Sequence, residues 1–228
     1  MRTEPARAER ADAPVDGVAP PESESWAEWV KDYYRNVESY DWVAVADRIR
    51  GPETFFHRSR ARSVRSLVGR FADASAPMLD AGCGTGLNLR HLPPGSTGLD
   101  LNPRHLALVK QRLPDHPTVL GDVEAMPFDD ESFGTVVCTE VIEHVPHPAR
   151  ALAEIMRVLR LGGVLIGSVP ARTPIWKLRV LSRTCGGGEP FHEHYRPSEV
   201  RAMLSDFEIV RVGRSIERMN VMFVGRRR

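Results

Sequence analysis

Two periodicities of apolar residues divide the chain into a helical region and a mixed region. Within residues 26–75, apolar side chains recur at spacings of three and four, as Trp26, Trp29 and Val30 do, which is typical of a helix with one buried face. A second helix is expected over about Thr54–Phe71. We therefore expect residues 26–75 to be an N-terminal helical cap.

From residue 76 onward, short apolar runs end in acids or glycines and alternate with helical stretches. The expected strands are 77–80, 96–100, 117–120, 134–139 and 163–169, and the expected helices are 85–92, 103–112 and 148–160. Such alternation predicts an α/β fold, in which helices cover both faces of a mostly parallel sheet.

The order changes near the end of the chain. Pro197 opens a predicted helix, because proline is favoured in the first turn. Residues 207–212 and 219–224 then read as two strands joined by a short polar turn, so one terminal strand should be antiparallel. At the other end, residues 1–25 contain four prolines and almost no large apolar group, which predicts a disordered tail.

Charge and cysteine content narrow the classes of function. The formal net charge is +1 over 228 residues, which does not favour a nucleic-acid partner. The three cysteines form no CxxC pair, which argues against a disulfide framework or a cysteine zinc site and favours a cytoplasmic protein. We also expect no signal peptide and no transmembrane segment, since no apolar run approaches about 20 residues.

The stretch "MLDAGCGTGLNLR", residues 78–90, places glycines at 82, 84 and 86 between a predicted strand and a predicted helix. Glycines at the carboxyl end of a buried strand let a ligand approach the backbone, although a tight strand-to-helix turn would also use them. Dinucleotide-binding loops follow G-x-G-x-x-G, and Leu87 breaks that spacing. No Gly-Lys-Ser/Thr follows either, which disfavours a nucleoside triphosphate.

Acids follow the next two predicted strands. Asp100 stands 18 residues after Gly82, where a carboxylate can accept hydrogen bonds from both hydroxyls of a ribose. Asp122, in "GDVEAMPF", can accept from the exocyclic amine of an adenine, while the N–H of Val123 meets a ring nitrogen. Together with the loop, these residues predict an adenosine pocket.

With these motifs the sequence resembles the class I S-adenosylmethionine-dependent methyltransferases, in particular the type 11 group. The resemblance covers about residues 76–170, weakens toward 225, and rests on "LDAGCGTG", "GLDLN", "GDVEAMPFDDESFGTVVCTEVIEHV" and "RVLRLGGVLIGSVP". It implies a Rossmann-like seven-stranded sheet with an antiparallel C-terminal hairpin. It also implies these cofactor-binding residues: Gly82, Gly84 and Gly86 around the methionine part, Asp80 organising the loop, Asp100 on the ribose, Leu101, Asp122 and Val123 around the adenine, and Thr139 near the sulfonium.

The segment "TEVIEHV" contains a second candidate site. Glu140, Glu143 and His144 stand at i, i+3 and i+4, so a helical turn would place them on one face, where they could bind Mg²⁺, Mn²⁺ or Zn²⁺. Two subgroups resemble this pattern: the small-RNA 3′-terminal 2′-O-methyltransferases, which add a later histidine, and the O-methyltransferases of ubiquinone synthesis. His194 best matches that later histidine, with His192 beside it. In the alternative, without a metal, His144 and Glu143 are catalytic and act as a base or orient the acceptor.

Two basic stretches lie outside these motifs. Residues 58–70 contain five arginines and no acid, which fits either a solvated helix face or a basic lid beside an anionic substrate. The insertion at 171–196 mixes apolar and basic residues. It fits a helix packed on the domain, a lid over a hydrophobic or anionic acceptor, or a peripheral membrane contact. His57 and His147 are expected at the surface.

We therefore expect residues 76–228 to form the S-adenosylmethionine-binding methyltransferase domain. It would methylate an oxygen of a small-molecule acceptor, with a nitrogen or a carbon as the alternative atom. The alternatives are a metal-dependent RNA 2′-O-methyltransferase, an O-methyltransferase of a quinone precursor, and, from a different class, a regulatory protein that binds S-adenosylmethionine without catalysis. The loop spacing counts against a dinucleotide oxidoreductase. The oligomeric state is left open.

Overall fold

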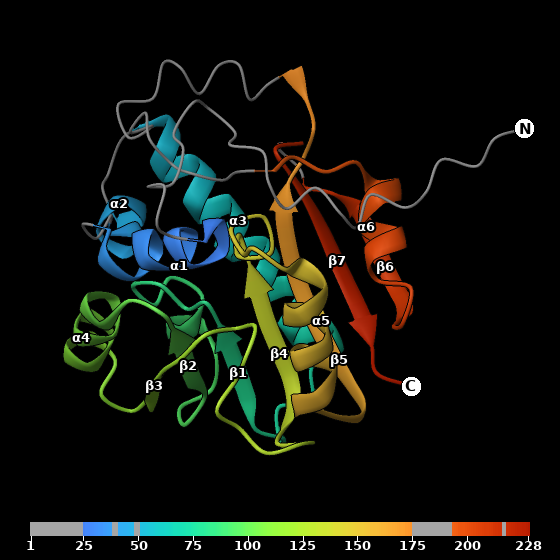
Figure 1. Cartoon of the computed structure of the whole chain (residues 1–228). Coiled ribbons are helices and arrows are strands. Elements are labelled where there is room, and N and C mark those ends of the chain that lie inside the picture. The colour runs from blue at the N-terminus through green and yellow to red at the C-terminus, as the bar shows by residue number, and fades with distance from the viewer. Residues whose placement is uncertain (1–24, 38–40, 48–50, 175–192, 216–217) are drawn as a thin grey trace, which may run out of the picture.

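A computed structural model of the chain describes residues 25–37, 41–47, 51–174, 193–215 and 218–228 (Figure 1). The tail predicted to be disordered, up to residue 24, lies outside these residues. So does the larger part of the predicted insertion, residues 175–192. The boundaries of the cap, the domain and the insertion therefore stay predictions.

In the described part of the chain, seven strands form one sheet with the order β3-β2-β1-β4-β5-β7-β6. The strands are β1 Met78–Ala81, β2 Thr97–Asp100, β3 Thr118–Leu120, β4 Phe133–Thr139, β5 Leu159–Pro170, β6 Glu208–Arg214 and β7 Asn220–Arg226. Strands β1 to β5 pair in parallel, whereas β7 is antiparallel to both β5 and β6. The predicted fold class and the antiparallel hairpin are confirmed.

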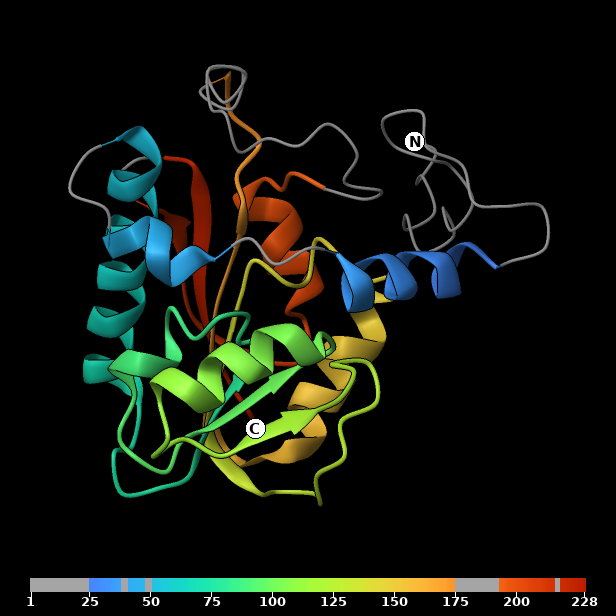
Figure 2. The ribbon, with the colours of Figure 1, turned by 90° about the vertical axis from the view of Figure 1, so that its left-hand side faces the viewer.

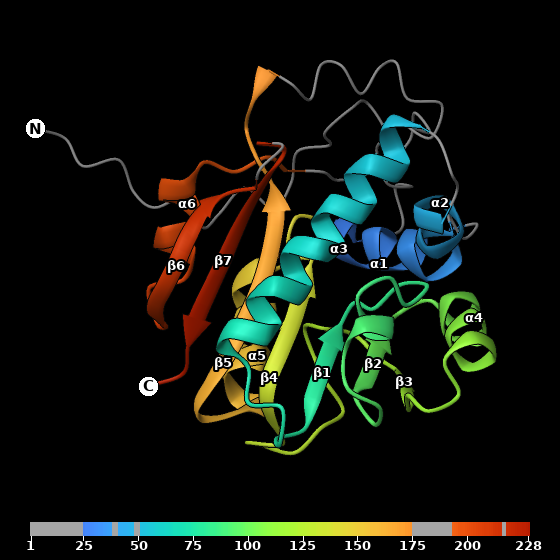
Figure 3. The same ribbon diagram turned by 180° about the vertical axis from the view of Figure 1, so that it is seen from behind.

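Helices cover both faces of this sheet. The helices are α1 Trp26–Asn36, α2 Trp42–Asp47, α3 Pro52–Phe71, α4 Pro103–Arg112, α5 Pro148–Val158 and α6 Pro197–Met203. Helices α5 and α6 share one apolar cluster with the sheet, and α3 and α4 share the other. Figure 1 shows α5 in front of the sheet, and Figure 3, seen from behind, shows α3 crossing the opposite face.

The alternation of side chains along the central strands explains this two-sided burial. On β1, Leu79 joins the α5 side and Met78 the α3 side, and on β4, Val136 and Val137 divide in the same way. All four are almost completely buried. Parallel strands buried on both faces need apolar residues at consecutive positions, as the short apolar runs of the sequence predicted.

One predicted helix is wrong. Within 85–92 only Leu89–His91 are helical, as a single 3₁₀ turn, η1. Gly86 has φ +92°, which no right-handed helix accepts, and Pro93 and Pro94 follow directly. The glycines that open the loop therefore prevent a regular helix from starting there.

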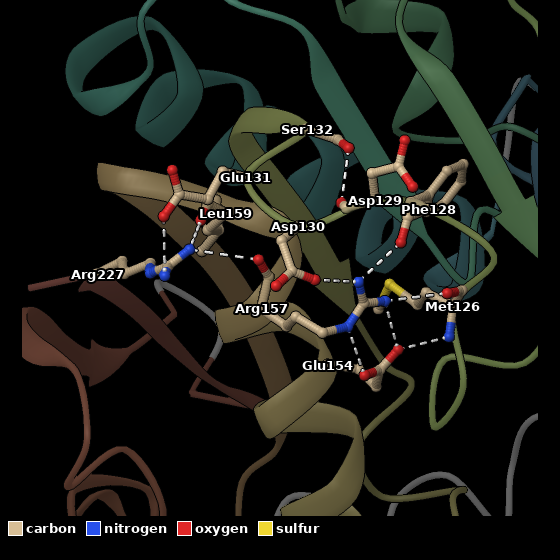
Figure 4. A network of polar contacts seen from close by, with 10 residues as sticks. All are labelled: Met126, Phe128, Asp129, Asp130, Glu131, Ser132, Glu154, Arg157, Leu159 and Arg227. Carbon is tan, nitrogen blue, oxygen red and sulfur yellow. Dashed lines mark hydrogen bonds and ion pairs between the residues drawn. The ribbon is translucent and has the colours of Figure 1, made fainter.

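Arg157 on α5 ties this helix to the segment between β3 and β4 (Figure 4). Its guanidinium donates to both carboxylate oxygens of Glu154, at 2.8 and 2.9 Å, and to Asp130 at 2.8 Å. It also donates to the carbonyl oxygens of Met126 and Phe128, at 3.0 and 2.7 Å. One side chain thus fixes the loop that follows Asp122.

Helices α1 and α2 lie over the edge of the sheet at which the parallel strands end (Figures 1 and 2). Arg112 pairs with Asp41 at 2.6 Å and Arg90 pairs with Asp47 at 3.0 Å, which attaches α2 to α4 and to η1. The strand order reverses between β1 and β4, and this edge is where open α/β sheets bind ligands. The N-terminal helices therefore roof the predicted site.

Candidate functional site

A cavity lies at this edge, beneath α1, α2 and α3. The glycine loop after β1 and the residues that follow β2, β3 and β4 form its floor, and side chains of the three N-terminal helices complete its wall. Segments separated by more than a hundred residues therefore meet in one concave site.

The glycine loop turns sharply as it leaves β1. Gly82 and Cys83 both donate their backbone N–H to the carbonyl of Leu99 on β2, at 2.8 and 2.9 Å. Gly82 has φ +74° and Gly84 has φ +53°. A Cβ at Gly82 would overlap Val141, and one at Gly84 would press on the Trp42 ring at 3.3 Å. Both glycines line the cavity, so the loop needs them for its own turn and for the packing of α2 as well as for a ligand.

Two predicted cofactor residues lie behind the cavity wall rather than on it. Gly86 is buried, and a Cβ there would meet Leu113 at 2.9 Å. Asp80 is 1% exposed, and its Oδ2 has no hydrogen-bond partner among the described residues. Burial, and secondly the charge of Asp100, raise the pKa of Asp80 to about 7, although a hydrogen bond from the backbone of Leu89 acts in the opposite direction. Neither Gly86 nor Asp80 lines the cavity, so both support the loop rather than contact a ligand directly.

Asp100 lines the cavity at the end of β2 and holds two neighbouring segments together. Its Oδ2 accepts the N–H of Gly84 at 2.8 Å. Its Oδ1 accepts the N–H of Asn102 at 2.9 Å and lies 3.2 Å from Nδ1 of His105. A carboxylate offers about four lone-pair sites, so one more donor can be accommodated. Leu101, the next residue, also lines the cavity, as the adenosine prediction requires.

Asp122 and Val123 line the cavity after β3, and Asp122 has an unexpected partner. Its Oδ1 accepts the N–H of Glu124 at 2.8 Å, while its Oδ2 lies 2.7 Å from Nζ of Lys31 on α1. Lys31 also lies 2.6 Å from Oε2 of Glu124. Burial lowers the pKa of Lys31, but the hydrogen bonds to the two carboxylates outweigh it and raise the pKa overall. The carboxylate predicted to accept the adenine amine is therefore already paired with the cap through Oδ2.

Thr139 and Asn88 meet where β4 faces the glycine loop. Nδ2 of Asn88 donates to Oγ1 of Thr139 at 2.7 Å, and both side chains line the cavity. Oδ1 of Asn88 is buried without a hydrogen-bond partner in the described part of the chain. Sequence reasoning missed Asn88, because it fell inside the helix wrongly predicted over 85–92. Its polarity between Leu87 and Leu89 was the available signal.

Glu140 follows Thr139 and adopts φ +55°, which is rare for a residue with a side chain. Its Oε1 accepts from Oγ of Ser168 at 2.7 Å and from Nδ2 of Asn220 at 2.6 Å. Its Oε2 lies 3.3 Å from Nη1 of Arg60. Residues of β5, β7 and α3 therefore hold this carboxylate in place.

His144 stands between an acid and a tyrosine from the cap. Its Nδ1 lies 2.8 Å from the hydroxyl of Tyr34, and its Nε2 lies 3.8 Å from Oε1 of Glu143. Glu143 is fully buried, His144 is partly exposed, and all three side chains line the cavity. The two residues predicted to be catalytic are thus adjacent, and Tyr34 is an addition that the sequence did not indicate.

The predicted metal ligands are not assembled into one group. Across the described ranges no three His, Cys, Asp or Glu side chains are placed to hold a metal ion. Glu143 and His144 are adjacent, but Glu140 is bound by Arg60, and His194 does not line the cavity. His192 lies outside the described residues. The metal site stays a prediction.

The expectation for His57 is wrong, since His57 is 8% exposed and lines the cavity beside Arg60. His147 is half-buried at the start of α5. None of the described helices is both long and apolar enough to cross a membrane.

Comparison with known proteins agrees with this geometry. Residues 79–167 match the family described as "Methyltransferase domain". A segment of 95 residues is 44% identical to the phthiotriol/phenolphthiotriol dimycocerosates methyltransferase of Mycobacterium leprae, covering 39% of this chain and 35% of that protein. Another of 104 residues is 36% identical to the malonyl-[acyl-carrier protein] O-methyltransferase of Serratia marcescens, covering 44% and 41%. The matches thus span well under half the length of these relatives.

Among solved structures, magnesium protoporphyrin IX methyltransferase from Synechocystis PCC 6803, with bound S-adenosylhomocysteine, superposes with a TM-score of 0.66. The sequence identity is 17%, and the alignment covers 88% of this chain and 99% of that chain. At this identity the similarity concerns the fold alone.

Proposed function

Because residues 79–167 form a methyltransferase domain of the S-adenosylmethionine-dependent type, we propose that the protein transfers a methyl group from S-adenosylmethionine to an oxygen atom of a small-molecule acceptor. One observation carries the proposal. A single cavity collects the glycine loop after β1, Asp100 after β2, Asp122 after β3, and His144 in the turn after β4.

The cavity offers acceptors suited to this cofactor. Asp100 has room for a ribose hydroxyl, and Leu101 and Val123 provide apolar contact for an adenine. Oδ1 of Asn88, buried and unpartnered among the described residues, fits the ammonium group of the methionine part. S-adenosylmethionine supplies a methyl group already activated by the positive sulfur to which it is bonded. The protein then has chiefly to align the acceptor and to remove its proton.

His144 is placed to take that proton. The Tyr34 hydroxyl, 2.8 Å from Nδ1, marks a position at hydrogen-bond distance from the imidazole. An acceptor hydroxyl that bonds to Tyr34 can pass its proton to the phenol oxygen while the phenol proton moves to Nδ1 of His144. The buried carboxylate of Glu143, 3.8 Å from Nε2, then stabilises the imidazolium.

The N-terminal helices seal the site in this proposal. Lys31 joins α1 to Asp122, so an adenine amine would share this carboxylate with Lys31 or displace it. Water excluded by such a roof cannot compete for the acceptor proton or screen the charges of the site.

The first test is calorimetric titration of S-adenosylhomocysteine into the wild type and the Asp100→Ala and Asp100→Asn variants, with exposed Asp129→Ala as the control. We expect Asp100→Ala to abolish measurable binding, and Asp100→Asn, which keeps one acceptor oxygen for Gly84, to weaken it by about tenfold. Unchanged affinity in Asp100→Ala would refute the pocket assignment.

The second test incubates the protein with methyl-labelled S-adenosylmethionine and fractions of a small-molecule extract. Labelled ether or ester products that depend on His144 support O-methylation. Tight cofactor binding with no labelled product in any fraction would instead favour a non-catalytic protein.

A further inference from the structure

Arg60 on α3 differs from the other four arginines of the run 58–70. Those four side chains are exposed, whereas Arg60 is 7% exposed and lines the cavity. We propose that Arg60 binds a carboxylate of the methyl acceptor, which makes the acceptor an organic acid. This inference rests on the proposed function, because it names the substrate class of the same site.

The contacts of Arg60 leave one of its three nitrogen atoms without a partner in the described part of the chain. Its Nη1 lies 3.3 Å from Oε2 of Glu140, and its Nη2 lies 3.4 Å from Nδ1 of His57. The guanidinium also stacks over the Phe56 ring, 5.5 Å from the centroid. Its Nε is buried and has no hydrogen-bond partner within the described ranges. A buried N–H without an acceptor is unfavourable, so a ligand that supplies an acceptor is favoured.

The place of Arg60 in the fold separates it from the nucleoside end. Glu140, its partner, is bonded to Ser168 on β5 and Asn220 on β7. The residues suited to adenosine, Asp100 and Asp122, follow β2 and β3. In the order β3-β2-β1-β4-β5-β7-β6, these strands lie on the opposite side of the β1–β4 switch point. Arg60 therefore belongs to the part of the cavity that the acceptor would occupy.

The chemistry of this end favours a carboxylate with an apolar body. A planar guanidinium presents N–H groups along its edges at the spacing of two carboxylate oxygens. Glu140 and Phe56 hold the guanidinium in one orientation, so little freedom is lost on binding. Glu140 also compensates the charge of Arg60, so a carboxylate would be held chiefly by charge-assisted hydrogen bonds from the guanidinium N–H groups. Phe56, on the cavity wall, provides apolar contact for the rest of the acceptor.

The test compares benzoate with benzamide, which have the same shape and differ in charge. Each is titrated into the protein with and without saturating S-adenosylhomocysteine, and tryptophan fluorescence and calorimetry report binding. We expect the wild type with S-adenosylhomocysteine to bind benzoate at least about tenfold more tightly than benzamide. Arg60→Gln should remove this preference, and Arg65→Gln, on the exposed face of the same helix, should keep it.

Arg60→Gln leaves the partly buried Glu140 without its cation and could fail to fold. The double variant Arg60→Gln/Glu140→Gln removes both charges and serves as the second test, with circular dichroism as the check on folding. Equal wild-type affinities for benzoate and benzamide, no binding of either, or a preference that survives in the double variant would overturn the inference.

The cofactor also has a carboxylate, and a further comparison distinguishes the two sources. 5′-Methylthioadenosine lacks the amino-acid part of S-adenosylhomocysteine. If the double variant weakens S-adenosylhomocysteine but not 5′-methylthioadenosine, Arg60 serves the cofactor and the acceptor assignment is overturned. Absence of S-adenosylhomocysteine binding to the wild type would refute the proposed function itself, whereas loss of the benzoate preference alone would refute only this inference.

Discussion

Replacement of Asp80 by asparagine should stabilise the cofactor-free protein by an amount that grows with pH. Asp80 is almost completely buried, and its Oδ2 has no partner in the described part of the chain. Burial, with a smaller contribution from Asp100, raises the pKa of this carboxyl from an ordinary value of 3.8 to about 7. Asparagine keeps the shape and one acceptor oxygen but has no proton to lose.

The folded and unfolded states lose the Asp80 proton at different pH values, which makes the stability of the wild type depend on pH. Because the pKa of Asp80 is higher in the folded protein, the unfolded chain ionises first as pH rises. The folded state is thus progressively disfavoured from about pH 4 to about pH 7, and little changes above that. The free energy of unfolding falls by about 1.36 kcal/mol for each pH unit between the two pKa values. The wild type therefore loses about 4 kcal/mol of stability over this interval.

The variant avoids this loss, so its stability relative to the wild type should increase by roughly 2–3 kcal/mol between pH 5 and pH 8. Urea unfolding, followed by circular dichroism at both pH values, gives the free energy of unfolding of each protein. The comparison requires that the dependence of this free energy on urea concentration is the same for both proteins. Asp129→Asn, on the surface, controls for the loss of one negative charge. A difference between Asp80→Asn and wild type that stays constant or shrinks as pH rises would refute the reasoning.

Three further substitutions test the site and the scaffold. Tyr34→Phe removes the hydrogen bond to His144 and should lower the single-turnover rate of methyl transfer by about tenfold without changing S-adenosylhomocysteine affinity; an unchanged rate would exclude Tyr34 from proton transfer. Gly82→Ala places a Cβ against Val141 at φ +74° and should cost about 3 kcal/mol in urea unfolding; a cost below about 1 kcal/mol would show that the loop relaxes. Arg157→Lys keeps the positive charge but loses the planar set of N–H donors, and should lower the free energy of unfolding by about 2 kcal/mol. Equal stability of variant and wild type would show that the hydrogen bonds of Arg157 contribute nothing to stability.

Each of these variants has a matched control on the same element or in the same kind of position. Tyr33→Phe removes the neighbouring phenol, which is absent from the cavity wall. Gly69→Ala lies on the exposed side of α3 with open space around it and should stabilise slightly. Arg150→Lys changes an exposed arginine on α5.

The nucleoside end of the site was predictable because it depends on short segments. A loop or acid directly after a strand lies at the carboxyl edge of a parallel sheet, whatever packs around it. Gly82, Gly84, Asp100 and Asp122, which follow predicted strands, and Thr139, which the family resemblance implied, all line one cavity. The prediction of a helix over 85–92 failed because Gly86 adopts φ +92° and Pro93 and Pro94 follow, which leaves a single 3₁₀ turn.

The roof of the site was not predictable. The helices that carry Lys31, Tyr34 and Arg60 have amphipathic sequences like those of many surface helices. No neighbouring residue in the sequence distinguishes Arg60 from the exposed arginines beside it. Their roles arise from contacts with residues 80 to 110 positions away, such as Glu140 and His144. The same packing gave Glu140 partners from three elements, which the spacing of a metal motif could not reveal.

By itself, then, the sequence determined the alternation of strands and helices, the terminal hairpin and several residues on the floor of the cavity, because periodicity and the residues at strand ends are local properties. The tertiary structure alone decided which charges of the N-terminal helices face that floor. Burial and pairing of a charge depend on the rotation of a whole helix against the sheet, and that rotation is set by the sum of its apolar contacts rather than by any single residue.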